Sequence, residues 1–134
     1  MADFVIDTQI IIWYLENSIR LSPAANKTLD DTIENGGSLI ISTISIVEII
    51  YLIEKGRIVP DVLSLVNYEL RLRSSSFASQ DLTKEISNAL SHIPRSTVRD
   101  MPDRIIAATA LHLDLPLITS DESIRKLESI VTIW

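Results

Sequence analysis

Short apolar runs alternate with longer amphipathic segments along the whole chain of 134 residues. Five of these runs predict β-strands, at residues 3–6, 38–42, 77–79, 115–119 and 130–134. The segments between them predict helices at 9–16, 23–35, 45–56, 61–73, 81–91 and 102–112, with a turn or two at 122–127. Strands that alternate with helices are typical of a parallel sheet covered on both faces. The pattern therefore predicts an α/β fold of three layers (α/β/α), and residues 1–134 are expected to form a single domain.

Capping residues support several of these boundaries. Thr8 is suited to be the N-cap of the first helix, and Ser22 with Pro23 announces the second. Gly36 closes the second helix, and Gly56 ends the third.

Composition narrows the class of protein. Apolar residues make up 46% of the chain, as in a globular protein. The sequence contains no run of eighteen apolar residues, so it predicts no membrane span. The chain has no cysteine, which excludes thiolate metal sites and thiol nucleophiles, and it begins without a signal-peptide pattern. We therefore expect a cytoplasmic protein. The formal net charge of −6 argues against a broad basic surface for nucleic acid, but carboxylates gathered in a cation site give the same excess.

Four acidic residues stand where a charge is not expected. Asp7 follows the first strand and Asp121 follows the fourth, while Glu48 interrupts the apolar run IVEIIYLI and Asp103 lies in the first turn of a late helix. Ligands bind at the carboxyl ends of parallel strands, so these carboxylates are expected to meet there. Clustered carboxylates repel each other unless a hard divalent cation neutralises them, and Mg²⁺ and Mn²⁺ prefer carboxylate oxygen.

Each acid also has a structural interpretation that the sequence leaves open. Asp103 favours the positive end of its helix, and Asp121 suits an N-cap. Asp7 can be a simple turn residue, and Glu48 can form a salt bridge with one of the arginines.

Three stretches together resemble the PIN-domain nucleases, and most of all the VapC-type toxins of bacterial toxin–antitoxin pairs. They are DTQIIIWYLENSIRLSPAA, ISTISIVEIIYLIEKGRI and DMPDRIIAATALHLDLPLITSD. The resemblance is weakest between residues 59 and 95. It implies an Mg²⁺- or Mn²⁺-dependent endoribonuclease that cuts single-stranded RNA by two-metal phosphodiester hydrolysis, leaving a 5′-phosphate and a 3′-hydroxyl. It also implies an antitoxin partner of the VapB kind and a homodimer, for which the apolar helices 9–16 and 45–56 offer surface.

The resemblance implies that Asp7, Glu48, Asp103 and Asp121 are both the catalytic residues and the metal ligands. Asp100 matches the first acid of the D-x-x-D pattern and is a further candidate metal ligand. The chain departs from its relatives at Gln9, where they often carry histidine, and in the order Asp-Met-Pro-Asp over residues 100–103. These departures leave every carboxylate in place and bear on the subfamily and the RNA target.

Other polar residues near these acids have two interpretations each. Thr8 and Ser120 can either hydrogen-bond the carboxylates or cap helices. The arginines at positions 95, 99 and 104 can either contact RNA phosphates or pair with the neighbouring aspartates. His92 and His112 have no partner at metal-ligand spacing, and we expect both to be ordinary surface residues.

Two other functions share some of these features. A phospho-accepting receiver domain has a similar length and an acidic Mg²⁺ pocket, but it needs paired acids after the first strand and a lysine ending a late strand. Here Asp7 stands alone, and the segment IVTIW contains no lysine. A PIN-like interaction module without activity is the other alternative, and the presence of all four acids argues against it.

Overall fold

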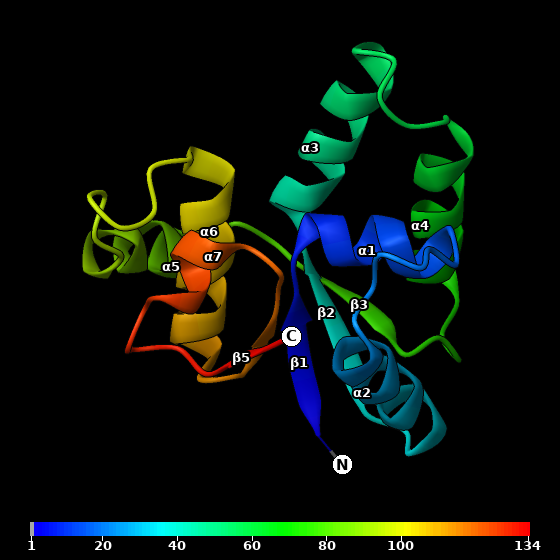
Figure 1. Ribbon diagram of the computed structural model, residues 1–134, viewed down its shortest axis with the longest axis horizontal. Helices are drawn as coiled ribbons and strands as arrows, with labels where there is room; N and C mark the ends of the chain where they lie inside the picture. Colours follow the sequence, from blue (N-terminus) through cyan, green and yellow to red (C-terminus); the bar gives the residue numbers. More distant parts are fainter. Residues whose placement is uncertain (1) are drawn as a thin grey trace.

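The computed structural model describes residues 2–134 as an α/β fold (Figure 1). Its strands are β1 (Asp3–Ile6), β2 (Ser38–Ser42), β3 (Phe77–Gln80), β4 (Leu117–Ile118) and β5 (Thr132–Ile133). Its helices are α1 (Thr8–Leu15), α2 (Pro23–Glu34), α3 (Thr43–Glu54), α4 (Asp61–Arg71), α5 (Lys84–Ala89), α6 (Met101–Leu113) and α7 (Glu122–Arg125), with a 3₁₀ turn, η1 (Leu90–His92).

All strand pairs of the sheet are parallel, in the order β3-β2-β1-β4-β5. The chain first builds outward from β1 to β2 and β3, then crosses back to place β4 on the other side of β1. The strand order therefore reverses between β1 and β4. In open parallel sheets, such a reversal opens a crevice at the carboxyl ends of the two strands.

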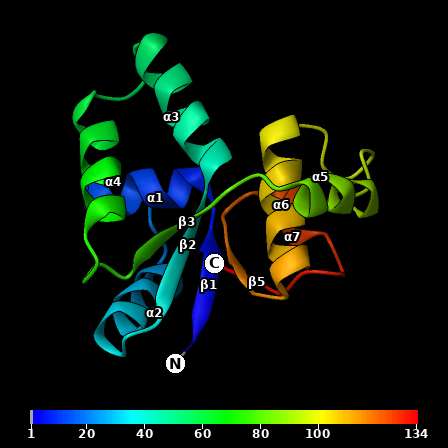
Figure 2. The same ribbon diagram turned by 180° about the vertical axis from the view of Figure 1, so that it is seen from behind.

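Helices cover both faces of the sheet, as the two opposite views show (Figures 1 and 2). Ile6, Leu39 and Ile118 belong to a core cluster with α1, α2 and α4, while Val5 and Leu117 pack with α5, α6 and α7. Alternate residues of one strand thus point to opposite cores. This explains why the strands are apolar throughout, and the predicted three-layer α/β/α class is confirmed.

Element boundaries differ from the predictions by a few residues. Asp7, not Thr8, is the N-cap of α1, because its side chain accepts a hydrogen bond from the Thr8 backbone N–H. Thr83 caps α5, so that helix begins three residues later than predicted. β4 and β5 contain two residues each, shorter than the apolar runs that predicted them.

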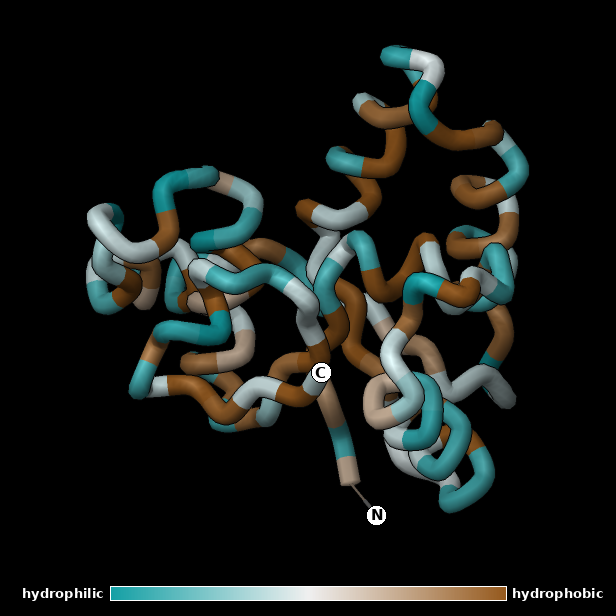
Figure 3. Tube along the Cα trace, in the orientation of Figure 1, coloured by the Kyte–Doolittle hydropathy of each residue, from teal (hydrophilic) through white to brown (hydrophobic). Residues whose placement is uncertain are grey.

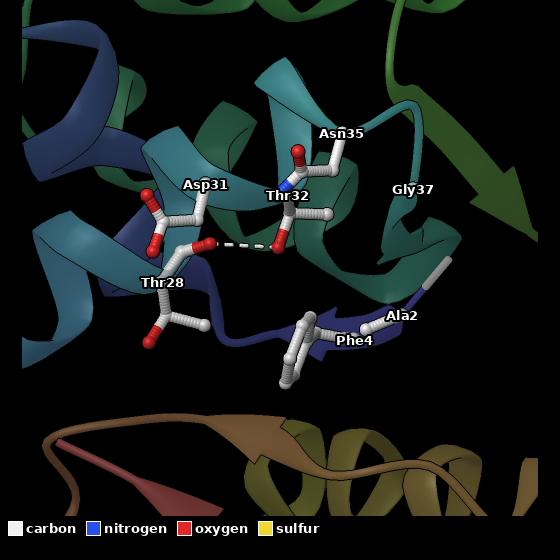
Figure 4. Close-up of a pocket in the computed structure, with 7 residues that line it drawn as sticks. All are labelled: Ala2, Phe4, Thr28, Asp31, Thr32, Asn35 and Gly37. Atoms are coloured by element: carbon white, nitrogen blue, oxygen red, sulfur yellow. Dashed lines mark hydrogen bonds between the residues drawn. The ribbon is translucent and has the colours of Figure 1, made fainter.

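A cavity of about 270 Å³ lies at the amino edge of the sheet, on the α2 side (Figure 4). Two of its polar side chains are bonded within α2: Thr32 donates to the Thr28 carbonyl at 2.6 Å, and Asp31 pairs with Lys27 at 2.7 Å. Gly37 closes the cavity where β2 begins, and a Cβ atom there would lie 2.0 Å from the Ala2 carbonyl oxygen. The cavity therefore lies at a junction of strand and helix whose closest approach is at Gly37.

No helix within residues 2–134 is long and apolar enough to cross a membrane. Both histidines, His92 and His112, are exposed.

Candidate active site

A pocket of about 310 Å³ opens at the carboxyl edge of the sheet, where the strand order reverses. Its lining residues are Asp7, Thr8, Gln9, Glu48, Leu52, Asp103, Ser120 and Asp121. The structure thus brings the four acids that stand out in the sequence into one pocket, although they come from four separate elements. Topology accounts for the meeting, because β1 and β4 end side by side.

Asp7 is the most deeply buried of these acids, with 5% of its surface exposed. Its Oδ1 accepts from the Thr8 backbone N–H at 2.8 Å, and its Oδ2 accepts from the Thr119 hydroxyl at 2.6 Å. Burial raises the pKa of Asp7, the two hydrogen bonds oppose that rise, and the nearby Asp121 carboxylate adds to it. Hydrogen bonds on both oxygens hold this carboxylate in a single orientation.

Glu48 reaches the pocket from the second turn of α3 and is half-buried. Its Oε1 accepts from the Thr8 hydroxyl at 2.6 Å, and that hydroxyl also lies 2.8 Å from the Ser45 hydroxyl. Burial raises the pKa of Glu48, the Thr8 hydrogen bond opposes the rise, and Asp7 and Asp100 increase it. The arginine partner that the sequence left open for Glu48 is absent among the described residues, where one salt bridge, Lys27–Asp31, is found.

Asp103 and Asp100 come from the amino end of α6, where Asp100 is the N-cap position. Burial raises the pKa of Asp103 to about 8, and repulsion from Asp7, Asp121, Asp100 and Glu48, in that order, contributes to the rise. In the described part of the chain, the Asp103 carboxyl group has no hydrogen-bond donor or cation within contact distance that would offset its burial and the repulsion from the other acids. At neutral pH without a cation, this carboxyl group is therefore mostly protonated.

Asp121 follows β4 and also caps α7, since its Oδ1 accepts from the Ile124 backbone N–H at 3.0 Å and from the Ser123 hydroxyl. The capping role that the sequence allowed is thus present, and the residue still lines the acidic pocket. Thr119 is the polar residue that sequence reasoning missed: it, and not Ser120, donates to Asp7. Its place at the end of the apolar run LPLIT gave no distinguishing signal, because the role of its hydroxyl depends on β4 lying beside β1.

Arg104 follows neither of its two sequence interpretations. Its guanidinium donates to the backbone carbonyls of Leu90 and Ile93, at 3.1 Å and 2.9 Å, instead of pairing with Asp100 or Asp103. It therefore ties α6 to the η1 turn. Arg95 and Arg99 are exposed, and neither forms a salt bridge within residues 2–134.

The donor set fits a hard divalent cation. Glu48, Asp100 and Asp103 each offer a carboxylate oxygen, and these three atoms lie within 4.8 Å of one another. All the candidate ligands are carboxylates, which Mg²⁺ and Mn²⁺ prefer. Repulsion among them is unrelieved by any basic side chain of the described residues, so a cation at this place would remove an unfavourable interaction.

Comparison with known proteins gives matches in both sequence and structure. Residues 4–129 match the PIN domain family. The chain is 29% identical to Ribonuclease VapC22 of Mycobacterium tuberculosis over 139 aligned positions, which cover all of both chains.

Solved structures show the same fold. A DNA-bound VapBC from Salmonella typhimurium superposes with a TM-score of 0.72 at 19% identity, covering 98% of this chain and 97% of that one. VapBC2 from Rickettsia felis, bound to a DNA fragment from its promoter, gives a TM-score of 0.71 at 15% identity, covering 97% and 96%. At these identities the likeness concerns the fold.

Proposed function

The chain belongs to the PIN domain family, as its sequence predicts, and from this premise we propose that it is an Mg²⁺- or Mn²⁺-dependent endoribonuclease acting on single-stranded RNA. We propose further that it is the toxin of a cytoplasmic toxin–antitoxin pair. One observation carries the proposal: carboxylates from four elements crowd one pocket without a basic partner among the described residues, and the pKa of Asp103 is raised to about 8. Ribonuclease VapC22, which is 29% identical to this chain, is named as an RNA-cutting enzyme.

In this proposal Asp7, Glu48, Asp103 and Asp121, which line one pocket, would hold the cations, and Asp100, which offers an oxygen close to those of Glu48 and Asp103, is a further candidate ligand. When bound, divalent cations lower the pKa of water and stabilise charge on a phosphodiester. Asp7, Glu48, Asp103 and Asp121 are the proposed catalytic residues.

Neighbouring hydrogen-bond donors orient two of the acids. Thr119 and the Thr8 backbone hold Asp7 by both oxygens, and the Thr8 hydroxyl holds Glu48. Pre-set ligands of this kind lower the reorganisation that binding requires. Asp103, whose pKa is raised to about 8, would have to give up its proton to hold a cation, so cation binding would be coupled to proton release.

The partners follow from the same family. Two of the similar structures are described as VapBC, one of them DNA-bound and the other bound to a promoter fragment. A similar chain from Klebsiella pneumoniae is described as part of a toxin–antitoxin complex. We propose an antitoxin of the VapB kind and a homodimer for this chain.

Cleavage of single-stranded RNA tests the function. Wild-type protein should cut it with Mg²⁺ or Mn²⁺ and leave it intact with EDTA. Asp7→Asn should abolish cleavage, because a neutral amide is a poorer ligand for a hard cation and disturbs the charge of the site. The variant should melt at the same temperature as the wild type or higher, because it removes one of several repelling carboxylates.

The same assay separates the alternatives. A receiver domain would be labelled by acetyl phosphate and would not cut RNA, and an interaction module would do neither. Equal, metal-independent cleavage by wild type and Asp7→Asn would show that this pocket is not the source of the activity.

A further inference from the structure

A second groove adjoins the acidic pocket, between α3 and the amino end of α6. It has a volume of about 310 Å³ and is lined among others by Val47, Tyr51, Lys55, Met101 and Pro102. Two residues, Glu48 and Leu52, line both the groove and the acidic pocket. The groove is therefore a continuation of the candidate active site.

One face of α3 carries the polar groups of this groove. Glu48, Tyr51 and Lys55 are spaced by three and four residues, so their side chains follow one another along the same face. In Figure 1, α3 extends beyond the carboxyl edge of the sheet, and Figure 3 shows hydrophobic residues along much of it. A strand of RNA with its scissile phosphate at a cation in the acidic pocket would therefore reach Tyr51 and Lys55 next along this face.

Tyr51 and Lys55 have the chemistry that an unpaired nucleotide requires. Tyr51 is 58% exposed as a residue, although aromatic residues are usually buried, and its ring forms no aromatic pair within residues 2–134. Lys55 is the only cation among the residues that line the two pockets, and no salt bridge holds it in the described chain. Nucleic-acid sites combine such stacking rings with cations for the backbone.

We propose that this groove holds the nucleotide next to the scissile phosphate, with its base stacked on Tyr51 and its backbone phosphate at Lys55. The inference rests on the proposed ribonuclease function and adds the residues that select the substrate. A base that stacks on Tyr51 is no longer available for pairing in a duplex. The groove thus provides a physical reason for cutting single strands.

Lys55 is the feature of the groove that favours RNA over an apolar protein partner as the occupant. The chain carries a net charge of −6, and Glu48 and Asp100 flank the groove. A polyanion can approach only where a local cation and bound divalent ions offset this charge, and Lys55 stands where the strand would leave the acidic pocket.

Steady-state cleavage of a short single-stranded RNA tests the inference, with a set of substrates in which one nucleotide at a time lacks its base. Tyr51→Ala should raise KM about tenfold with little change in kcat, which is the usual effect of losing one base–aromatic stack. Tyr51→Phe should behave as wild type. The exposed Tyr68 of α4 supplies the matched control, Tyr68→Ala.

Two further readouts are specific to a nucleotide site. A substrate that lacks its base at the one position beside the cut should have a KM about tenfold higher for the wild type. The KM of Tyr51→Ala should be the same with and without that base, because this variant has already lost the stack. Lys55→Gln should reduce the slope of log KM against log salt by about 0.7, the value for one phosphate of a single strand. Lys126→Gln, at an exposed lysine after α7, is its control.

The outcomes are distinguishable. If wild-type protein fails to cut RNA, the proposed function fails, and the inference fails with it. If wild type cuts RNA and Tyr51→Ala matches it on every substrate, the inference alone is overturned. Unchanged RNA cleavage by Tyr51→Ala, together with weaker binding of a co-expressed antitoxin, would show instead that the groove is a protein-docking surface.

Discussion

Individual acids in the pocket differ in how the protein holds them. Short hydrogen bonds from Thr119 and Thr8 fix Asp7 and Glu48. Asp103 has no such hydrogen bond in the described chain, and burial and repulsion from the other acids raise its pKa. The sequence singled out the acids because charges at strand ends and in apolar helices are unusual. It could not single out Thr119, because a threonine at the end of a strand is common and its hydroxyl acquires meaning only when β4 is placed beside β1.

The unpaired carboxyl groups make stability depend on pH when no cation is present. In the unfolded chain Asp103 ionises near its ordinary pKa of 3.8, but in the folded protein it holds its proton up to about pH 8. The folded state therefore binds more protons between these values, and the free energy of unfolding falls as pH rises through that window. Asp7 and Glu48 shift in the same direction.

We expect the melting temperature in EDTA to fall from mildly acidic to mildly basic pH. Asp103→Asn should flatten this fall and melt higher than wild type at the basic end, and thermal melts across this pH range check both points. A wild-type melting temperature that rises through the window would contradict the unpaired state of the cluster.

Thr119→Val should weaken divalent-cation binding about 10- to 100-fold, the usual effect of losing a group that orients a metal ligand. The change keeps the shape of the side chain and removes the hydroxyl that donates to Asp7. Mn²⁺ titration measures the effect, with Thr119→Ser as the variant that should retain affinity. Ser120→Ala is the neighbouring control, and an equal loss in both would mean that the hydroxyl of Thr119 has no special role.

At the scale of elements, periodicity and caps predicted every strand and helix, but not all of their lengths. LPLIT and IVTIW predicted strands of five residues, but β4 pairs with β1 and with β5 only through Leu117 and Ile118, and β5 lies at the edge of the sheet. The N-cap of α1 was assigned one residue late, since Asp7 and Thr8 both suit that position, and the folded chain uses the Asp7 side chain to accept the Thr8 backbone N–H.

Gly37→Ala tests the junction between β1, β2 and α2. The added Cβ would lie 2.0 Å from the Ala2 carbonyl and 2.9 Å from the Thr32 side chain, so the backbone must move. Overpacking of this kind destabilises by about 1–3 kcal/mol. Chemical denaturation should show that loss without a change in metal affinity, because the junction lies at the edge opposite the acids. A variant as stable as wild type would mean that the first strand residues adjust freely.

At the scale of the whole molecule, the homodimer stays a prediction. The sequence assigned surface to helices 9–16 and 45–56, but Ile10, Ile11 and Ile12 of α1 are buried in the chain's own core. Apolar side chains remain exposed around the start of α4, with Val59 at 55% and Leu65 at 44%.

Sedimentation at tens of micromolar, a range that detects weak association, should give the mass of two chains. Leu65→Glu should shift the protein toward the monomer, because it places a charge in an apolar contact. A wild-type monomer at that concentration would contradict the dimer.

The central claim is that carboxylates at the reversal point of the sheet form a site for a divalent cation. Calorimetric titration of Mn²⁺ into metal-free protein near neutral pH, repeated in buffers of different ionisation enthalpy, tests it most directly. Binding should be saturable and should release a proton, because Asp103 is protonated without a cation and must ionise to bind one. Asp103→Asn should bind far more weakly and release no proton. Absence of binding by wild type, or equal affinity and proton release in Asp103→Asn, would contradict the account.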